Sequence, residues 1–116
     1  MIVRVFEGEM LVPDLDRVAL FTNEYPPNVY GGAGVHVEYL SRELAKLLPV
    51  EIRCFGDQDI SETNLHVKGY GPWEDAGENT DPRFAGVLDS FHRDLAMARD
   101  RLEASVVHCH TWYTGM

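Results

Sequence analysis

The chain has 116 residues, of which 10 are Lys or Arg and 19 are Asp or Glu, so its formal net charge is −9. This acidic balance argues against nucleic-acid binding, because phosphate recognition needs a concentrated basic face. No apolar run approaches the roughly 18 residues of a membrane span, and 45% hydrophobic residues suffice for one modest ordered core rather than a disordered chain.

The amino-terminal part of the chain predicts an extension followed by a buried strand. Residues 1–16 are expected to form a peripheral hairpin or loose extension, because a β-like run is followed by turn residues and then by Pro13. Residues 17–22 form a short, nearly continuous apolar run, which is typical of a strand buried on both faces of a parallel sheet. Two prolines and two asparagines then predict a loop over residues 23–30.

A helix and a second strand are predicted after this loop. The glycine segment 31–34 opens a stretch whose apolar residues recur at helical spacing until Pro49 ends it. Residues 50–55 are a second strand candidate, and Gly56 stops it.

The rest of the chain predicts a polar connection, a second helix and a last strand. Residues 57–81 are acidic and rich in glycine, with one short strand expected at 65–67. The pair Asp81-Pro82 is typical of an N-cap and first helical turn, and a 3.6-residue apolar period predicts a helix over 82–102. A final apolar run predicts a strand at 105–110.

Strands that alternate with helices predict an α/β fold, here a partial Rossmann-like parallel sheet with flanking helices. Ligands of such sheets bind beyond the carboxyl ends of the strands. Two features fall there: the glycine segment that follows the first buried strand, and the segment His110-Thr111-Trp112 that follows the last one.

The glycine segment suggests an anion site. Gly31, Gly32 and Gly34 allow a tight turn and a close approach of a ligand to the backbone, and the positive end of the helix favours phosphate. The alternative is a turn that merely lets helix and strand pack closely. The spacing is not the dinucleotide fingerprint, and no phosphate-loop Lys follows. Asp57, placed where an acid could bind ribose, keeps a nicotinamide-cofactor enzyme open as an alternative.

Histidines and cysteines raise the question of a metal. His108 and His110 point to one face of the last strand and Cys109 to the other, and these residues match no standard metal-binding spacing. We therefore expect no metal. His110 could instead donate to a substrate oxygen, and Trp112 could form an apolar wall of a sugar pocket or simply belong to the core. Two cysteines are too few for a disulfide framework. Because the sequence also shows no secretory signal, we expect a cytoplasmic protein.

These motifs together resemble a known family. Residues 17–27, RVALFTNEYPP, and 29–37, VYGGAGVHV, resemble the amino-terminal signature of bacterial glycogen synthases and related retaining glycosyltransferases. Residues 106–112, VVHCHTW, are similar to the family strand that ends in His-Asp-Trp or His-Thr-Trp. The resemblance covers roughly residues 17–56 and 84–116.

The resemblance implies a GT-B enzyme, in which two Rossmann-like domains face each other across a cleft. Residues 17–116 would be the incomplete first domain, and 1–16 an extension. Such enzymes move glucose from ADP- or UDP-glucose to an α-1,4-glucan, or to glucose 1-phosphate in a close branch, with retention and without metal or other cofactor. The resemblance places Gly31, Gly32 and Gly34 at the donor diphosphate and sugar and makes His110 the catalytic contact to the donor glucose. It places Glu24, His36 and Trp112 near the substrate.

Two departures qualify this expectation. Val29 stands where many glycogen synthases have a nucleotide-binding lysine, and Thr111 replaces the Asp of His-Asp-Trp. The family's second domain, with its basic phosphate clamp, lies outside these 116 residues, so we expect the chain alone to be inactive. The alternatives are a truncated, non-catalytic sugar- or nucleotide-binding module and a small NAD-type Rossmann protein. A partial sheet would also expose an edge and an apolar face, which predicts self-association.

Overall fold

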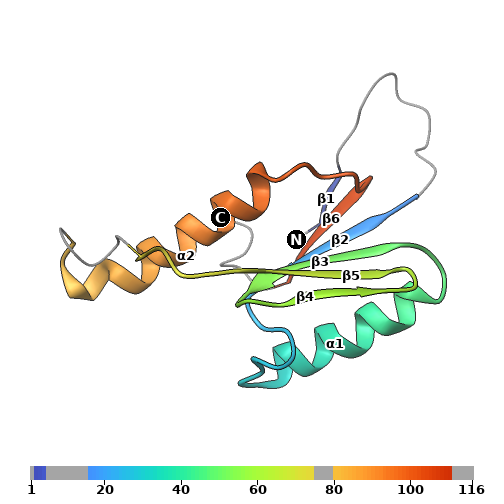
Figure 1. The fold of residues 1–116 in the computed structure, drawn as a ribbon, viewed down its shortest axis with the longest axis horizontal. Helices are drawn as coiled ribbons and strands as arrows, with labels where there is room; N and C mark the ends of the chain where they lie inside the picture. The colour runs from blue at the N-terminus through green and yellow to red at the C-terminus, as the bar shows by residue number, and fades with distance from the viewer. Residues whose placement is uncertain (1, 5–15, 75–79, 111–116) are drawn as a thin grey trace.

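The computed structural model of the chain describes residues 2–4, 16–74 and 80–110. Its elements follow one another in the order predicted for an α/β protein (Figure 1). They are β1 (Ile2–Arg4), β2 (Val18–Thr22), α1 (Gly32–Ala45), β3 (Val50–Phe55), β4 (Asp59–Glu62), β5 (Leu65–Tyr70), α2 (Pro82–Arg99) and β6 (Val106–His110).

The strands form one sheet in the order β1-β6-β2-β3-β5-β4. The pairs β6–β2, β2–β3 and β3–β5 are parallel, whereas β1 and β4 lie antiparallel at the two edges. This topology confirms the predicted Rossmann-like fold with a mostly parallel sheet and flanking helices.

The two helices cover opposite faces of the sheet (Figure 1). All five residues of β2 are buried, as expected for a central strand. Leu20 packs on the α1 side with Val37, whereas Ala19 and Phe21 pack on the α2 side with Met97. Alternating side chains of the same strands therefore build two separate apolar layers. The two cysteines are buried thiols, one in each layer: Cys54 on the α1 side and Cys109 on the α2 side.

The structure corrects the sequence-based elements at three places. The strand expected at 65–67 continues to Tyr70 and pairs with β4, which is not predicted from the sequence because this edge strand is mostly polar and exposed. Helix α2 ends at Arg99 rather than at residue 102, because Asp100 adopts an extended conformation. At the amino terminus β1 joins the sheet beside β6, while the rest of the predicted hairpin lies outside the described residues.

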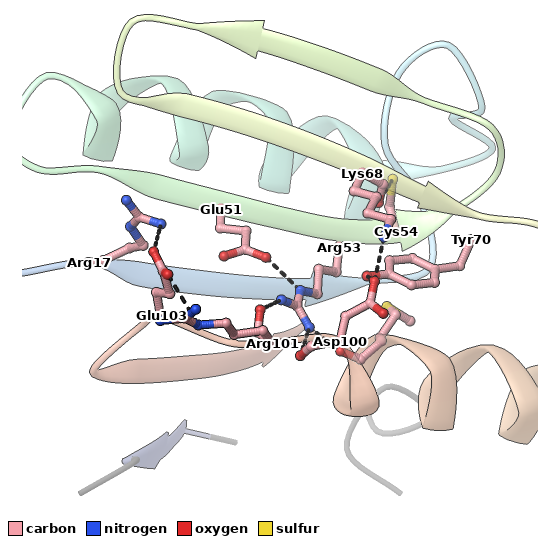
Figure 2. Close-up of polar contacts among 10 residues, drawn as sticks. Arg17, Glu51, Arg53, Cys54, Lys68, Tyr70, Asp100, Arg101 and Glu103 are labelled. Carbon is pink, nitrogen blue, oxygen red and sulfur yellow. Dashed lines mark hydrogen bonds and ion pairs between the residues drawn. The ribbon is translucent and has the colours of Figure 1, made fainter. Parts of the chain in front are cut away.

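The end of α2 is held by a buried arginine (Figure 2). Arg53 on β3 is 2% exposed. Its Nη1 donates to the carbonyls of Met97 and Asp100, and its Nη2 donates to the carbonyl of Arg101 at 2.7 Å. Its Nε donates to Glu51 at 2.6 Å. The guanidinium thus satisfies carbonyls that a helix end leaves without partners, and it lies at the negative end of the helix dipole.

The apolar face of α2 remains largely exposed. Five of the side chains with helical spacing are 38% to 57% exposed and form what we call the α2 stripe: Phe84, Val87, Leu88, Phe91 and Leu95. The amino-terminal half of α2 also extends beyond the sheet (Figure 1). This helix thus presents an exposed apolar face, whereas exposure of an apolar face of the sheet itself stays a prediction. Neither helix in the described ranges is long and apolar enough to cross a membrane.

We predict that the α2 stripe drives self-association of the 116-residue chain. Exposed apolar patches of this kind commonly mark interaction surfaces. Replacing Phe84 and Leu95 together with serine should shift the chain toward monomer in sedimentation velocity over a concentration series. A matched double change at the exposed polar positions Arg83 and Arg99 should leave the distribution unchanged. A wild-type chain that stays monomeric at every concentration would contradict the prediction.

A second prediction concerns Asp94 on α2. Asp94 is only 9% exposed, neither carboxylate oxygen has a hydrogen-bond partner among the described residues, and burial raises its pKa to about 6. The native state therefore holds this proton more tightly than the unfolded chain, whose reference pKa is 3.8. The free energy of unfolding should consequently fall as pH rises between these two values.

Asp94→Asn should remove the loss of stability that ionisation of the buried carboxyl causes as pH rises. We expect the variant to be more stable than wild type by roughly 1–2 kcal/mol at about pH 7, and the difference to shrink toward about pH 4, in urea denaturation at both pH values. Asp89→Asn is the matched control on the same helix. Burial of Asp89 would raise its pKa, but hydrogen bonds from the Trp73 amide and Arg93 outweigh this and hold the pKa below its usual value. That variant should lose stability; a gain for both variants would refute the assignment.

Candidate functional site

The carboxyl ends of β2 and β6 lie side by side. Thr22 is the parallel partner of His110 in the sheet, so both strands end at the same level. The loop that leads to the glycine segment departs directly from Thr22, whose hydroxyl donates to the carbonyl of Glu24 at 3.1 Å. The structure therefore brings the predicted loop and the predicted histidine to one edge of the sheet.

The loop between β2 and α1 is anchored by a buried tyrosine. Tyr25 is 2% exposed, and its hydroxyl lies 3.1 Å from the hydroxyl of Ser41 on α1. The amide of Asn28 donates to the Tyr25 carbonyl at 2.9 Å, and the same carbonyl accepts from Nε2 of Gln58 at 2.9 Å. The Pro26–Pro27 peptide bond, which lies between Tyr25 and Asn28 in the chain, is cis. Side chains from α1 and from the turn after β3 thus fix the loop over the strand ends.

Glu24 organises the second half of the loop. Its Oε2 accepts hydrogen bonds from the backbone amides of Tyr30, at 2.9 Å, and Gly31, at 3.0 Å. This carboxylate supplies negative charge next to the amino-terminal end of α1, where Gly31 itself provides no side-chain cap. The structure gives Glu24 an internal role in shaping the loop; its contact to substrate stays a prediction.

The three glycines of the segment differ in what surrounds them. A Cβ on Gly34 would lie 2.8 Å from Oε2 and 2.9 Å from Cβ of Glu24, so this glycine is needed for the helix to approach the loop. A Cβ on Gly31 or Gly32 would have no atom within 4 Å. Close packing therefore explains Gly34 but neither Gly31 nor Gly32, whose backbone borders open space.

Three histidines gather where the strands end. The rings of His36 on α1 and His110 on β6 are stacked, with centroids 5.2 Å apart and planes at 20°. The His108 ring lies 5.8 Å from that of His110, at 35°. Burial lowers the pKa of His110 below its usual value, and the neighbouring His36 lowers it further; burial likewise lowers the pKa of His108. His110 is therefore mainly neutral at pH 7, with one donor and one acceptor nitrogen.

The remaining candidates are placed as follows. Trp112, the predicted wall of a sugar pocket, lies outside the described residues. Cys109 faces the α2 layer, opposite to the neighbouring histidines. Within the part of the chain that the structure describes, no group of three His, Cys, Asp or Glu residues is arranged to hold a metal ion. Asp57, the residue that kept the nicotinamide alternative open, is exposed just beyond β3.

A hollow elsewhere on the molecule is distinct from this site. It lies at the opposite, amino-terminal ends of the parallel strands and is lined by residues that include Arg17, Glu51, Glu62 and His66. Its lining mixes both charges and contains neither the glycine segment nor any of the three gathered histidines. We therefore place the candidate site at the carboxyl ends of β2 and β6.

The mostly parallel sheet and its flanking helices define a Rossmann-like α/β protein, and the glycine-opened helix and His110 make the strand ends its candidate ligand site. The chain is 41% identical over 103 residues to the alpha-maltose-1-phosphate synthase of Mycolicibacterium smegmatis and to those of two strains of Mycobacterium tuberculosis. It is thus homologous to part of a retaining GT-B glycosyltransferase, as the sequence motifs predicted. No protein-family model matches the chain.

The extent of this match is informative in two ways. It covers 86% of this chain, more than the two segments that carry the resemblance, so the polar region between them is also related. It covers 23% of each synthase, so the chain spans about a quarter of the length of these relatives. The names of these relatives say that they make maltose 1-phosphate. They therefore correspond to the close branch of the family, not to the glycogen synthases that the resemblance named first.

Proposed function

We propose that this chain is part of a glucosyltransferase that moves glucose from ADP- or UDP-glucose to glucose 1-phosphate with retention of configuration. The observation that carries the proposal is the 41% identity to maltose-1-phosphate synthases. Residues 17–116 would then form the amino-terminal part of the first Rossmann-like domain.

The geometry of the strand ends supports this assignment. Open space next to Gly31 and Gly32 leaves room for a diphosphate at the first turn of α1. The Glu24 carboxylate already accepts from the Gly31 amide, so a diphosphate would have to displace this carboxylate or bind beside it. His110 ends the neighbouring strand and can offer a hydrogen bond to a sugar hydroxyl as a neutral imidazole. In this arrangement the backbone holds the phosphates and His110 orients the glucose, with Glu24 keeping the loop in shape between them.

The same geometry explains why we expect no turnover by the 116 residues alone. Departure of a nucleoside diphosphate needs donors or cations that stabilise its growing negative charge. The loop of residues 23–34 contains no Lys or Arg, and Arg42, further along α1, is paired with Glu38 at 3.5 Å. The charge of the leaving group would therefore have to be stabilised by residues outside this chain.

Titration calorimetry with ADP-glucose and UDP-glucose tests the proposal on the 116-residue chain. We expect weak binding that His110→Ala reduces roughly two- to tenfold, the range for loss of one hydrogen bond. His66→Ala is the matched control, because His66 lies on β5 and bonds to Ser61 at the far side of the sheet. An activity assay with glucose 1-phosphate as acceptor should show no product above background.

Other outcomes would point elsewhere. If neither nucleotide sugar binds, the chain does not bind the glucose donor and the proposal fails. This result would favour a truncated, non-catalytic module. NAD binding that is lost in Asp57→Ala would support the nicotinamide interpretation instead. Turnover by the purified 116-residue chain would refute the expectation that its catalytic groups are incomplete.

A further inference from the structure

The stacked pair of His36 and His110 is not explained by packing of the core. His36 lies on the second turn of α1 and is exposed, whereas the next residue, Val37, supplies the contact of that turn to the core. His110 is partly buried at the end of β6. Centroids 5.2 Å apart and planes at 20° correspond to an offset-stacked aromatic pair. An exposed ring thus lies flat on a partly buried ring at the edge of the candidate site.

The surroundings of His110 define which groups act on it. From α1 it faces His36, and on its own strand it faces His108, 5.8 Å away. Its partner on the neighbouring strand is the uncharged Thr22, and burial, together with His36, opposes its protonation. Of the two histidine rings, His36 lies more nearly parallel to that of His110, so its stacking opposes tilting of the His110 ring.

We propose that His36 is a positioning residue that fixes the ring plane of His110 by stacking and so directs one ring nitrogen toward the sugar of the donor. That the ring nitrogen faces a sugar rests on the proposed function, whereas the fixing of the ring plane by His36 does not. A flat ring is the property that matters, so phenylalanine should replace His36 in this role and alanine should not.

The first test needs no ligand. In the NMR spectrum of the 116-residue chain, the ring protons of His36 and His110 should show a nuclear Overhauser contact. The order parameter of the His110 ring should fall in His36→Ala and be retained in His36→Phe and in the control His66→Ala. The pKa of His110 should rise in both His36 variants, because each removes the imidazole that lowers this pKa electrostatically. Absence of the contact, or an unchanged His110 ring in His36→Ala, would overturn the proposal.

The second test adds ADP-glucose to the same variants. His36→Ala should weaken its binding roughly two- to tenfold, as expected for loss of one aromatic contact, while His36→Phe stays close to wild type. Equal weakening in both variants would show that the polar ring nitrogens of His36, not its flat ring, matter, and would also overturn the proposal. If ADP-glucose binds to no variant and not to wild type, the proposed function fails, and the ring measurements alone then decide whether His36 positions His110.

Discussion

Replacing Arg53 with alanine is expected to lower the free energy of unfolding by about 3–5 kcal/mol, the range for removing one partner of a buried charged network. The loss has two sources. The carbonyls of Met97, Asp100 and Arg101 would lose their donor at the end of α2, and Glu51, whose side chain is 13% exposed, would lose its ion-pair partner. The cation also lies 5.7 Å from the ring of Phe21, a contact that disappears with it.

Urea denaturation of matched variants checks this prediction. Arg53→Lys should recover only part of the loss, because one ammonium cannot reproduce the planar fork that reaches several acceptors at once. Arg17→Ala is the control, since Arg17 forms an exposed ion pair with Glu103 at 3.3 Å and should cost less than about 1 kcal/mol. If Arg53→Ala is no more destabilising than Arg17→Ala, the guanidinium does not hold the end of α2.

The second large effect is expected at Gly34. A Cβ there would lie 2.9 Å from Cβ and 2.8 Å from Oε2 of Glu24, and 3.0 Å from Cγ1 of Val29. Atoms near the backbone cannot move aside as freely as the tip of a side chain, so the loop must shift away from α1. We expect Gly34→Ala to cost about 1–3 kcal/mol of stability, which is typical of an overpacked site.

Gly32→Ala separates this packing effect from a binding effect. No atom lies within 4 Å of a Cβ at Gly32, so the folded state should tolerate the methyl group. If the donor diphosphate lies against this turn, Gly32→Ala should weaken nucleotide-sugar binding without loss of stability, measured by denaturation and calorimetry on the same sample. Equal stability of the Gly34 and Gly32 variants would contradict the packing argument.

Local patterns in the sequence are sufficient to predict the fold class and the position of the candidate site. A continuous apolar run predicts β2, and the rule that ligands bind at strand ends places the glycine segment and His110 at the same edge of the sheet. The mostly polar edge strand β4 escapes such patterns because pairing with β5, rather than its own apolar period, makes it a strand.

Contacts between residues far apart in the sequence cannot be predicted in this way. Arg53 stands between apolar residues of β3, and most of its partners are backbone carbonyls at the end of α2, which no side-chain pattern reveals. The stacking of His36 on His110 likewise joins the beginning of α1 to the end of β6, two segments that lie far apart in the sequence. The period of α2 predicts a helix correctly, but periodicity does not say whether an apolar face meets the sheet or turns away from it.

The position of the two cysteines makes them independent reporters of how the molecule opens. Burial raises the pKa of Cys54 to about 12 and raises that of Cys109 as well, so neither thiol is a ready nucleophile in the native state. Cys54 lies under α1 and Cys109 under α2. Alkylation rates read by mass spectrometry would therefore time the detachment of each helix separately. A faster rate at Cys109 would identify the α2 side as the layer that exchanges first with solvent.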